Sequence, residues 1–200
     1  LSIIIILFLG LRPISYHFGD TVNYALTFSY LQNGIIKIDP DASDWLFYWL
    51  MENASKVMSI NTFLLIIEFG YIGCTLWACK RLMRNNVWAA LLMNLAAFSY
   101  YSYGINGIRN GLACSIMLVA FSYILGSKKD KLIAAILCFC AYNIHNSMAL
   151  PILMMVISAF ILPIFRHKLT LAITCWIVSI LLSLTIGDWL ETFFAGFDID

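Results

Sequence analysis

Two arginines, a histidine and an aspartate are the residues of this sequence whose types and positions could do chemistry. Arg109, in GINGIRNGLA, and Arg12 carry guanidinium groups, which bind phosphate oxygens through paired hydrogen bonds. His145, in NIHNSMALP, and Asp20 are candidate general bases, because imidazole and carboxylate groups can take up a proton near neutral pH. Together they predict a site that binds a phosphate group and removes a proton beside it.

Arg109 is the most suggestive of the four, although a structural role stays open for it. It lies in the first turn of an expected helix, between Gly107 and Gly111, which allow a ligand or another backbone to approach closely. The unpaired N–H groups at the start of a helix also favour anions. The alternative is an interfacial arginine whose side chain extends to lipid headgroups.

The other polar candidates have structural alternatives as well. His145 could cap the helix that follows it, together with its polar neighbours. Arg12 and Asp20 could form a salt bridge, which is the usual role of an exposed Arg–Asp pair. Glu68 lies inside an apolar segment, where an acid is costly in lipid and is therefore a functional candidate. Its alternative is a hydrogen-bonded packing residue at a close helix contact near Gly70.

The composition indicates that lipid is the solvent of this chain. Hydrophobic residues make up 62% of the 200 residues and charged residues only 12%, against about 25% charged in a typical soluble domain. The formal net charge of +1 argues against nucleic acid as a partner, and the sequence has neither a zinc motif nor a glycine-rich phosphate loop. The six cysteines lie in apolar segments and are expected to be buried thiols, so no metal is predicted.

The basic residues are grouped in a way that predicts how the chain crosses the membrane. Most of them lie at residues 80–84, 128–131 and 166–168, and successive clusters are two apolar segments apart. By the positive-inside rule, all three clusters face the cytoplasm. The residues then expected on the opposite, extracytoplasmic side are Arg12, Asp20, Arg109, His145 and the acids that follow Gly187.

The apolar segments predict an all-α fold, a polytopic transmembrane helix bundle with about six full spans and a partial N-terminal one. Residues 132–165 are too long for one span and are expected to turn at 143–147. The chain is expected to be a single transmembrane domain over 1–200, truncated at both ends. The expected helices are 1–11, 61–79, 87–103, 107–125, the two halves of 132–165, and 169–186.

Residues 12–60 are predicted to form an extracytoplasmic loop that contains one helix. A turn is expected at 39–41, where the sequence reads Asp-Pro-Asp. The helical spacing of apolar residues over 43–57, with several aromatic residues among them, predicts an interfacial amphipathic helix. The apolar residues of this helix are expected to be Leu46, Trp49, Leu50 and Val57.

The chain resembles the EpsG family of bacterial membrane proteins, which are Wzy-like polymerases of exopolysaccharide and O-antigen repeat units. Three motifs carry the resemblance: GLRPISYHFGDTVNY, GIRNGLACSIMLVAFSYI and NIHNSMALPIL. Their order and spacing are more specific than any one of them, and they cover most of residues 5–165. The sequence departs from the family pattern at Pro13, in an irregular loop, and at Asn110, where Gln is more usual.

The resemblance implies roles for particular residues. The positions that match the family motifs are Arg12, Asp20, Tyr24, Gly107, Arg109, Asn110, Ala113, His145, Ser147 and Ala149. The two arginines would bind the pyrophosphate of the donor. His145 or Asp20 would be the catalytic base, and Tyr24 and Asn110 would support the substrate.

The implied substrates are oligosaccharide repeat units linked by pyrophosphate to a polyprenol, at the outer face of the bacterial cytoplasmic (inner) membrane. A hydroxyl of one unit would attack the anomeric carbon of the growing chain, and polyprenyl pyrophosphate would leave without any cofactor. The chain would thus be a multi-pass glycosyltransferase of the cell envelope, with a chain-length regulator and a flippase as partners. The alternatives are a lipid-linked oligosaccharide flippase or transporter, an O-antigen ligase or multi-pass acyltransferase, and a structural membrane subunit.

Overall fold

The computed structural model describes residues 2–38, 43–161 and 169–181. All regular structure within these residues is helical, which confirms the all-α fold. Contacts between residues divide the chain into two compact units, Leu1–Met155 and Val156–Asp200, and each is described by itself. The predictions that lie outside the described residues are the turn at 39–41, the basic cluster at 166–168, the end of the helix at 169–186, and the acids Asp188, Glu191, Asp198 and Asp200.

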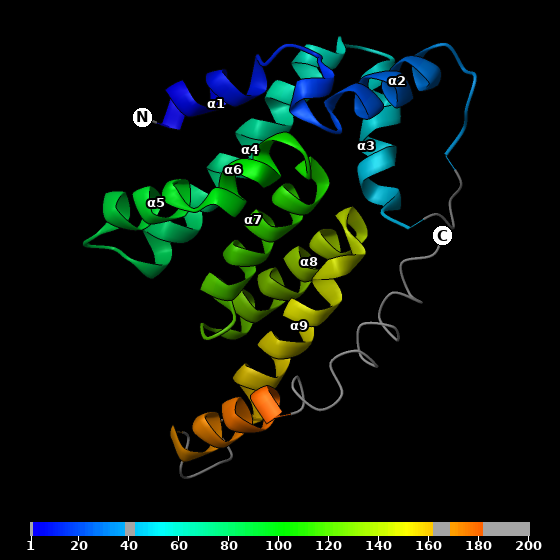
Figure 1. The fold of residues 1–200 in the computed structure, drawn as a ribbon. Coiled ribbons are helices and arrows are strands. Elements are labelled where there is room, and N and C mark those ends of the chain that lie inside the picture. Colours follow the sequence, from blue (N-terminus) through cyan, green and yellow to red (C-terminus); the bar gives the residue numbers. More distant parts are fainter. Residues whose placement is uncertain (1, 39–42, 162–168, 182–200) are drawn as a thin grey trace. The chain divides into compact units, whose positions relative to one another are not determined.

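Three helices form the centre of the first unit: α4 (Ile60–Leu82), α7 (Ile108–Tyr123) and α8 (Lys128–Ile144). α7 packs against both α4 and α8 (Figure 1). Phe63, Ile108 and Ile144 belong to one buried cluster, so the start of α4 and the start of α7 lie near the end of α8. Ala78 and Ala134 belong to a cluster at the opposite ends of the same helices. α4 and α7 therefore run in the same direction, and α8 runs back.

Two of the basic clusters lie at the same end of this bundle, in agreement with the alternation of the sequence. Arg81 lies in the last turn of α4, and α8 begins within the cluster at 128–131. Arg81 Nη2 is 3.8 Å from Asp130 Oδ1, and the guanidinium carbon of Arg81 lies 3.7 Å from the ring centroid of Tyr123. The starts of α4 and α7 and the end of α8 form the other end of the bundle.

The helix lengths support only part of the predicted set of spans. Among the described helices, α4, with 23 residues, is the one long and apolar enough to cross a membrane alone; the other apolar helices have 10–17 residues. The helix expected at 87–103 is two helices, α5 (Val87–Ala96) and α6 (Phe98–Ile105), because the backbone of Ala97 is extended, with ψ of 126°. The side chain of Asn94 donates to the carbonyl of the preceding turn at 2.9 Å, a bond that competes with regular helix pairing near the break.

The segment between the first helix and α4 contains more helix than the sequence predicts. Its elements follow α1 (Ser2–Gly10), which ends before Arg12-Pro13 as expected, and are η1 (Tyr16–Phe18), α2 (Thr21–Gln32) and α3 (Trp45–Ser55). α2 was not predicted, because polar residues interrupt its apolar pattern. Its buried residues Tyr24, Phe28 and Leu31 nevertheless follow the spacing of one helix face.

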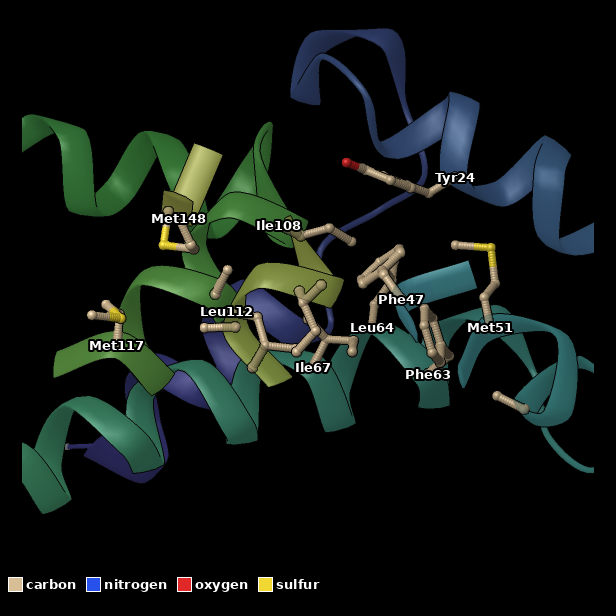
Figure 2. Close-up of a cluster of buried hydrophobic side chains, with 14 of the residues drawn as sticks. Tyr24, Phe47, Met51, Phe63, Leu64, Ile67, Ile108, Leu112, Met117 and Met148 are labelled. Carbon is tan, nitrogen blue, oxygen red and sulfur yellow. The ribbon is translucent and has the colours of Figure 1, made fainter. Parts of the chain in front are cut away.

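α3 confirms the helix expected within 43–57 but only part of its expected apolar face. Leu46 and Leu50 are half-buried and Trp49 is 49% exposed, whereas Phe47 is fully buried. Val57, which is 77% exposed, lies after the end of α3. Phe47 packs edge-on against Tyr24, with ring centroids 5.9 Å apart, and against Phe63, at 6.0 Å. Figure 2 shows these three rings within one apolar cluster shared by α2, α3 and α4. Phe47 and Met51 are thus buried by contact with α2 and α4.

The turn expected at 143–147 is present. α8 begins at Lys128, earlier than the apolar pattern suggests, because Ser127 and Asp130 form a capping box that starts the helix within its charged residues. α8 ends at Ile144, and the chain continues with η2 (Asn146–Met148) and α9 (Ala149–Val156). The described elements of the second unit are η3 (Ile157–Ile161) and the helix Leu169–Leu181.

Candidate functional site

Asp44 contacts both Arg109 and His145, the two residues on which the sequence-based hypothesis mainly rests. It lies immediately before α3, and only 6% of its side chain is exposed. Its Oδ2 accepts a hydrogen bond from Arg109 Nη1 at 2.9 Å and lies 3.0 Å from His145 Nδ1. Its Oδ1 accepts a hydrogen bond from the backbone N–H of Asn146 at 2.9 Å. Three segments that are distant in the sequence therefore meet at one carboxylate.

Arg109 lies in the first turn of α7, as predicted. Gly111 allows α7 to lie close to α6 there, since a Cβ at Gly111 would be 2.9 Å from the carbonyl oxygen of Tyr103. The guanidinium donates from Nη1 to the hydroxyl of Tyr48 at 3.0 Å and from Nε to the hydroxyl of Tyr24 at 3.4 Å. Its Nη2 donates to no group among the described residues, so two N–H bonds of Arg109 remain for a ligand.

His145 lies at the end of α8, where the chain turns toward η2. Its backbone is extended, with φ of −156° and ψ of 120°, and its side chain does not cap η2. The capping role considered from the sequence is therefore not found. Nδ1 faces Asp44, and Nε2 has no hydrogen-bond partner within the described part of the chain.

The two residues expected to support the substrate lie beside this cluster. The ring of Tyr24, whose hydroxyl accepts from Arg109, has its centroid 6.0 Å from the guanidinium carbon. Asn110 Oδ1 accepts a hydrogen bond from Ser147 Oγ at 3.4 Å, which connects the start of α7 to η2. Four of the six candidate residues named from the sequence are thus brought together: Tyr24, Arg109, Asn110 and His145.

The electrostatics of the cluster favour an ionised Asp44. Burial raises the pKa of this carboxyl, but hydrogen bonds from His145 and the Asn146 N–H and electrostatic interactions with His145 and Arg109 outweigh burial, and the net pKa lies below its ordinary value. An ionised carboxylate only accepts hydrogen bonds. The side chains of Arg109 and His145 are 27% and 28% exposed, so a substrate can reach both of them.

Arg12, the second arginine expected to bind pyrophosphate, lies in a different environment. Its side chain is 3% exposed, and Nη1 forms a salt bridge of 3.1 Å with Glu68 Oε1. Further hydrogen bonds run from Nη1 to the Leu9 carbonyl at 2.6 Å, from Nε to Thr21 Oγ1 at 3.2 Å, and from Nη2 to the Ile105 carbonyl at 3.4 Å. These bonds connect α1, α2, α4 and α6, which is the arrangement of a structural ion pair.

Asp20, the other candidate base, is also separate from the cluster around Asp44. It is exposed at the start of α2 and accepts a hydrogen bond from Asn23 Nδ2 at 3.3 Å. The Arg12–Asp20 salt bridge considered from the sequence is absent, because Arg12 pairs with Glu68. Of the two roles considered for Glu68, the structure supports a hydrogen-bonded packing residue. Its Oε2 has no partner among the described residues.

Sequence reasoning missed Asp44 and Tyr48. Asp44 was included in a loop with several acids. Its position just before the expected helix distinguishes it from Asp39 and Asp41, but that position indicates an N-cap residue and not a site residue. In the structure its side chain does not cap α3, which leaves both oxygens for His145, Asn146 and Arg109. Among the described residues no group of three or more His, Cys, Asp or Glu side chains could hold a metal ion.

Comparison with known proteins gives one result that bears on this site. No curated protein and no solved structure matches the chain. The family model described as the EpsG family matches residues 1–199, which includes all three motifs and every residue of the cluster around Asp44. The match covers nearly the whole sequence, and the chain therefore belongs to the EpsG family.

Proposed function

We propose that the chain polymerises polyprenyl-pyrophosphate-linked oligosaccharide repeat units into a surface polysaccharide. Membership of the EpsG family supports a role in polysaccharide synthesis. The observation that carries the proposal is the pairing of Arg109 and His145 at Asp44, with both side chains partly exposed. A cation with unused donors beside a possible base is what this group transfer needs.

In the proposed reaction Arg109 binds the pyrophosphate that links the growing chain to its lipid. A hydroxyl of the incoming repeat unit attacks the anomeric carbon, and its proton passes to His145 as the new C–O bond forms. The bond from the anomeric carbon to the pyrophosphate oxygen breaks, and its electron pair leaves with polyprenyl pyrophosphate. Arg109 stabilises the negative charge that develops on this leaving group. Tyr24 would support the substrate through Arg109, to which it offers its hydroxyl oxygen, and Asn110 would support it from the first turn of α7.

Arg109 and His145 are better candidates for these roles than Arg12 and Asp20. Arg12 already donates hydrogen bonds to four protein groups and is almost completely buried, so few donors remain for a phosphate. Asp20 is exposed, and its described partner is Asn23. We therefore propose a structural role for Arg12 and leave Asp20 as the less supported base.

The proposal includes a location in the bacterial cytoplasmic membrane, within one multi-pass domain. α4 is long enough to cross the bilayer, and two basic clusters lie at one end of the bundle while Arg109 and His145 lie at the other. By the positive-inside rule, the basic end faces the cytoplasm and the cluster around Asp44 faces outward. The lipid-linked oligosaccharide, the surrounding lipid, a chain-length regulator and a flippase are the proposed partners.

A flippase and an O-antigen ligase remain the competing functions. A flippase needs a cavity that opens to both sides, with polar groups at several depths. Glu68, the acid expected deep in the membrane, is buried and paired with Arg12, which does not favour such a path. A ligase would use the same donor chemistry and differ in its acceptor.

Deletion of the gene, followed by structural examination of the surface polysaccharide, tests the proposal. A polymerase predicts that single repeat units replace the polymer, with lipid-linked units accumulating on the outer leaflet. Units trapped on the inner leaflet would support the flippase. Polymer of normal length that remains attached to its lipid would support the ligase, and either result would contradict the proposed function.

A further inference from the structure

Asp44 is not needed to describe the reaction proposed above, yet it contacts both residues that would perform it. We infer that Asp44 is a positioning residue that couples donor binding to the base: it orients His145 and holds Arg109 until a diphosphate takes its place. The inference rests on the proposed function and goes beyond it by connecting Arg109, which binds the pyrophosphate, to His145, which acts as the base.

The first part of the inference concerns the orientation of the imidazole. An ionised carboxylate cannot donate, so the contact of 3.0 Å between Asp44 Oδ2 and His145 Nδ1 requires a proton on Nδ1. In the neutral ring, Nε2 then carries the free electron pair and is the atom that accepts a proton. The hydrogen bond from the Asn146 N–H to Asp44 Oδ1 fixes the chain next to the ring.

The second part concerns competition for Arg109. One oxygen of Asp44 accepts from Arg109 Nη1 and also contacts His145 Nδ1, so the positive charge of Arg109 offsets part of the negative charge that the imidazole experiences. A diphosphate on Nη1 and the unused Nη2 would draw Arg109 away from Asp44. The full charge of Asp44 then acts on His145 and makes it a stronger base at the moment when the donor is present.

The groups that determine the protonation of this cluster come from four elements. His145 faces Asp44 from the end of α8, and Arg109 faces it from α7. Tyr48 of α3 and Tyr24 of α2 reach the cluster through Arg109, to which they offer their hydroxyl oxygens. No other charged side chain among the described residues contacts Asp44.

The backbone of Asp44 supports a functional reading of this position. Its φ is 59° and its ψ is 26°, in the left-handed region, and it is the one described residue other than glycine with a positive φ. Such a conformation costs free energy for residues other than glycine and persists where the surroundings hold it in place. Asparagine tolerates this region as well as aspartate does. Asp44→Asn therefore removes the charge without adding backbone strain.

The test measures the pH at which His145 becomes half-protonated, in the full-length protein embedded in lipid nanodiscs. Diethyl pyrocarbonate reacts with an imidazole only when the ring is neutral. Mass spectrometry of peptides distinguishes His145 from His17 and His167. The probe is inorganic pyrophosphate, and the variants are wild type, Asp44→Asn, Arg109→Lys and the control Glu52→Gln. Glu52 is a matched acid of α3 that pairs with Lys56 at the surface.

We expect pyrophosphate to move the midpoint of modification to higher pH in wild type and in Glu52→Gln. Two effects contribute to this shift: the negative charge of pyrophosphate itself, and the release of Asp44 from Arg109, which is absent in Asp44→Asn. In Asp44→Asn the midpoint should start at lower pH and move less. Equal shifts in wild type and Asp44→Asn would overturn the inference. If Asp44→Asn does not accumulate, an unchanged midpoint in wild type on addition of pyrophosphate would overturn it as well.

The rate of polymer formation separates this inference from the proposed function. If wild type forms no polymer from lipid-linked repeat units, the proposed function fails, whatever the modification data show. If wild type forms polymer, Asp44→Asn should lower kcat by roughly 10- to 100-fold and shift the acid limb of the pH–rate profile to lower pH. A lower rate with an unshifted profile would mean that Asp44 is only structural, and the inference would fail while the proposed function stands.

Discussion

The two arginines that the sequence suggests as phosphate ligands, Arg12 and Arg109, lie in contrasting environments. Arg12 is 3% exposed and is surrounded by Glu68, Thr21 and two backbone carbonyls. Arg109 is 27% exposed, rests against two tyrosines, and shares Asp44 with His145. Both contact an acid, but only Arg109 keeps unused donors that a substrate can reach.

This difference shows how an arginine with a structural role can be distinguished from one that binds a ligand. A buried arginine without partners is very costly, so Arg12 needs every bond that surrounds it. An arginine that binds phosphate must retain free N–H groups and exposure, as Arg109 does. The number of unused donors is therefore more informative than the presence of a salt bridge, which both residues have.

The largest effect should follow from breaking the Arg12–Glu68 pair. Arg12→Met leaves the Glu68 carboxylate buried without its cation, and we expect the folded state to lose about 3–5 kcal/mol. The measurement is the unfolding temperature of the purified protein in detergent, together with its level in the membrane. Arg12→Met combined with Glu68→Leu should restore most of the stability, because the uncompensated charge is gone. A double variant as unstable as the single one would show that stability depends on the other hydrogen bonds of Arg12 and not on the uncompensated charge of Glu68.

Arg109→Ala should reduce polymer formation by roughly 100- to 1,000-fold while the protein remains folded. The expected loss is catalytic, because the arginine would contact the leaving group. Arg109→Lys should fall between wild type and Arg109→Ala, since a lysine keeps the charge but lacks the planar set of donors. The measurement is the chain-length distribution of the polysaccharide in strains with equal levels of the protein. A distribution like that of wild type in Arg109→Ala would contradict the contrast between the two arginines.

Gly19→Ala should have an intermediate effect, on stability more than on catalysis. Gly19 has φ of 54°, and a Cβ there would collide with the side chain of Asn106, so either Asn106 or the loop that connects Arg12 to α2 must move. We expect a loss of about 1–2 kcal/mol. Thermal unfolding measures it, and Gly34→Ala is the matched control: φ is also positive, at 67°, but no atom lies within 4 Å of the added carbon. Equal losses in both variants would assign the effect to backbone strain alone.

The smallest effect is the pH dependence of stability that comes from Asp44. Its pKa is lower in the folded protein than in the unfolded chain, so it stabilises the fold at pH values above its unfolded pKa. This contribution is lost as the pH falls through the folded pKa, which lies below about 4. The difference in unfolding temperature between wild type and Asp44→Asn should shrink as the pH falls below about 4, where the Asp44 carboxylate of the wild type becomes protonated. A difference that does not shrink there would contradict the lowered pKa.

Much of the framework was predictable from the sequence because apolar runs and basic clusters are strong, local patterns. α4, α7, the turn at His145 and the common end of two basic clusters all agree with these patterns. α2 and the break at Ala97 were missed, because they depend on which helices pack together and on backbone bonds. Composition alone does not contain this information.

The candidate site was predictable in its parts but not in its connections. Arg109 and His145 were chosen for their chemistry and their expected side of the membrane, and the structure brings them together. Asp44, the residue between them, is 65 residues from Arg109 and 101 residues from His145, a pairing that no local pattern can reveal. The opposite case is Arg12, whose chemistry suits phosphate but whose tertiary partners occupy its donors.

The most direct test of the central claim uses the full-length protein in lipid nanodiscs and a purified polyprenyl-pyrophosphate-linked repeat unit. The measurement is the release of polyprenyl pyrophosphate alongside the formation of polymer. Wild type should release one polyprenyl pyrophosphate for each new glycosidic bond, and Arg109→Ala and His145→Ala should form almost none. Polymer formation at the wild-type rate in both variants would contradict the assignment of the site around Asp44.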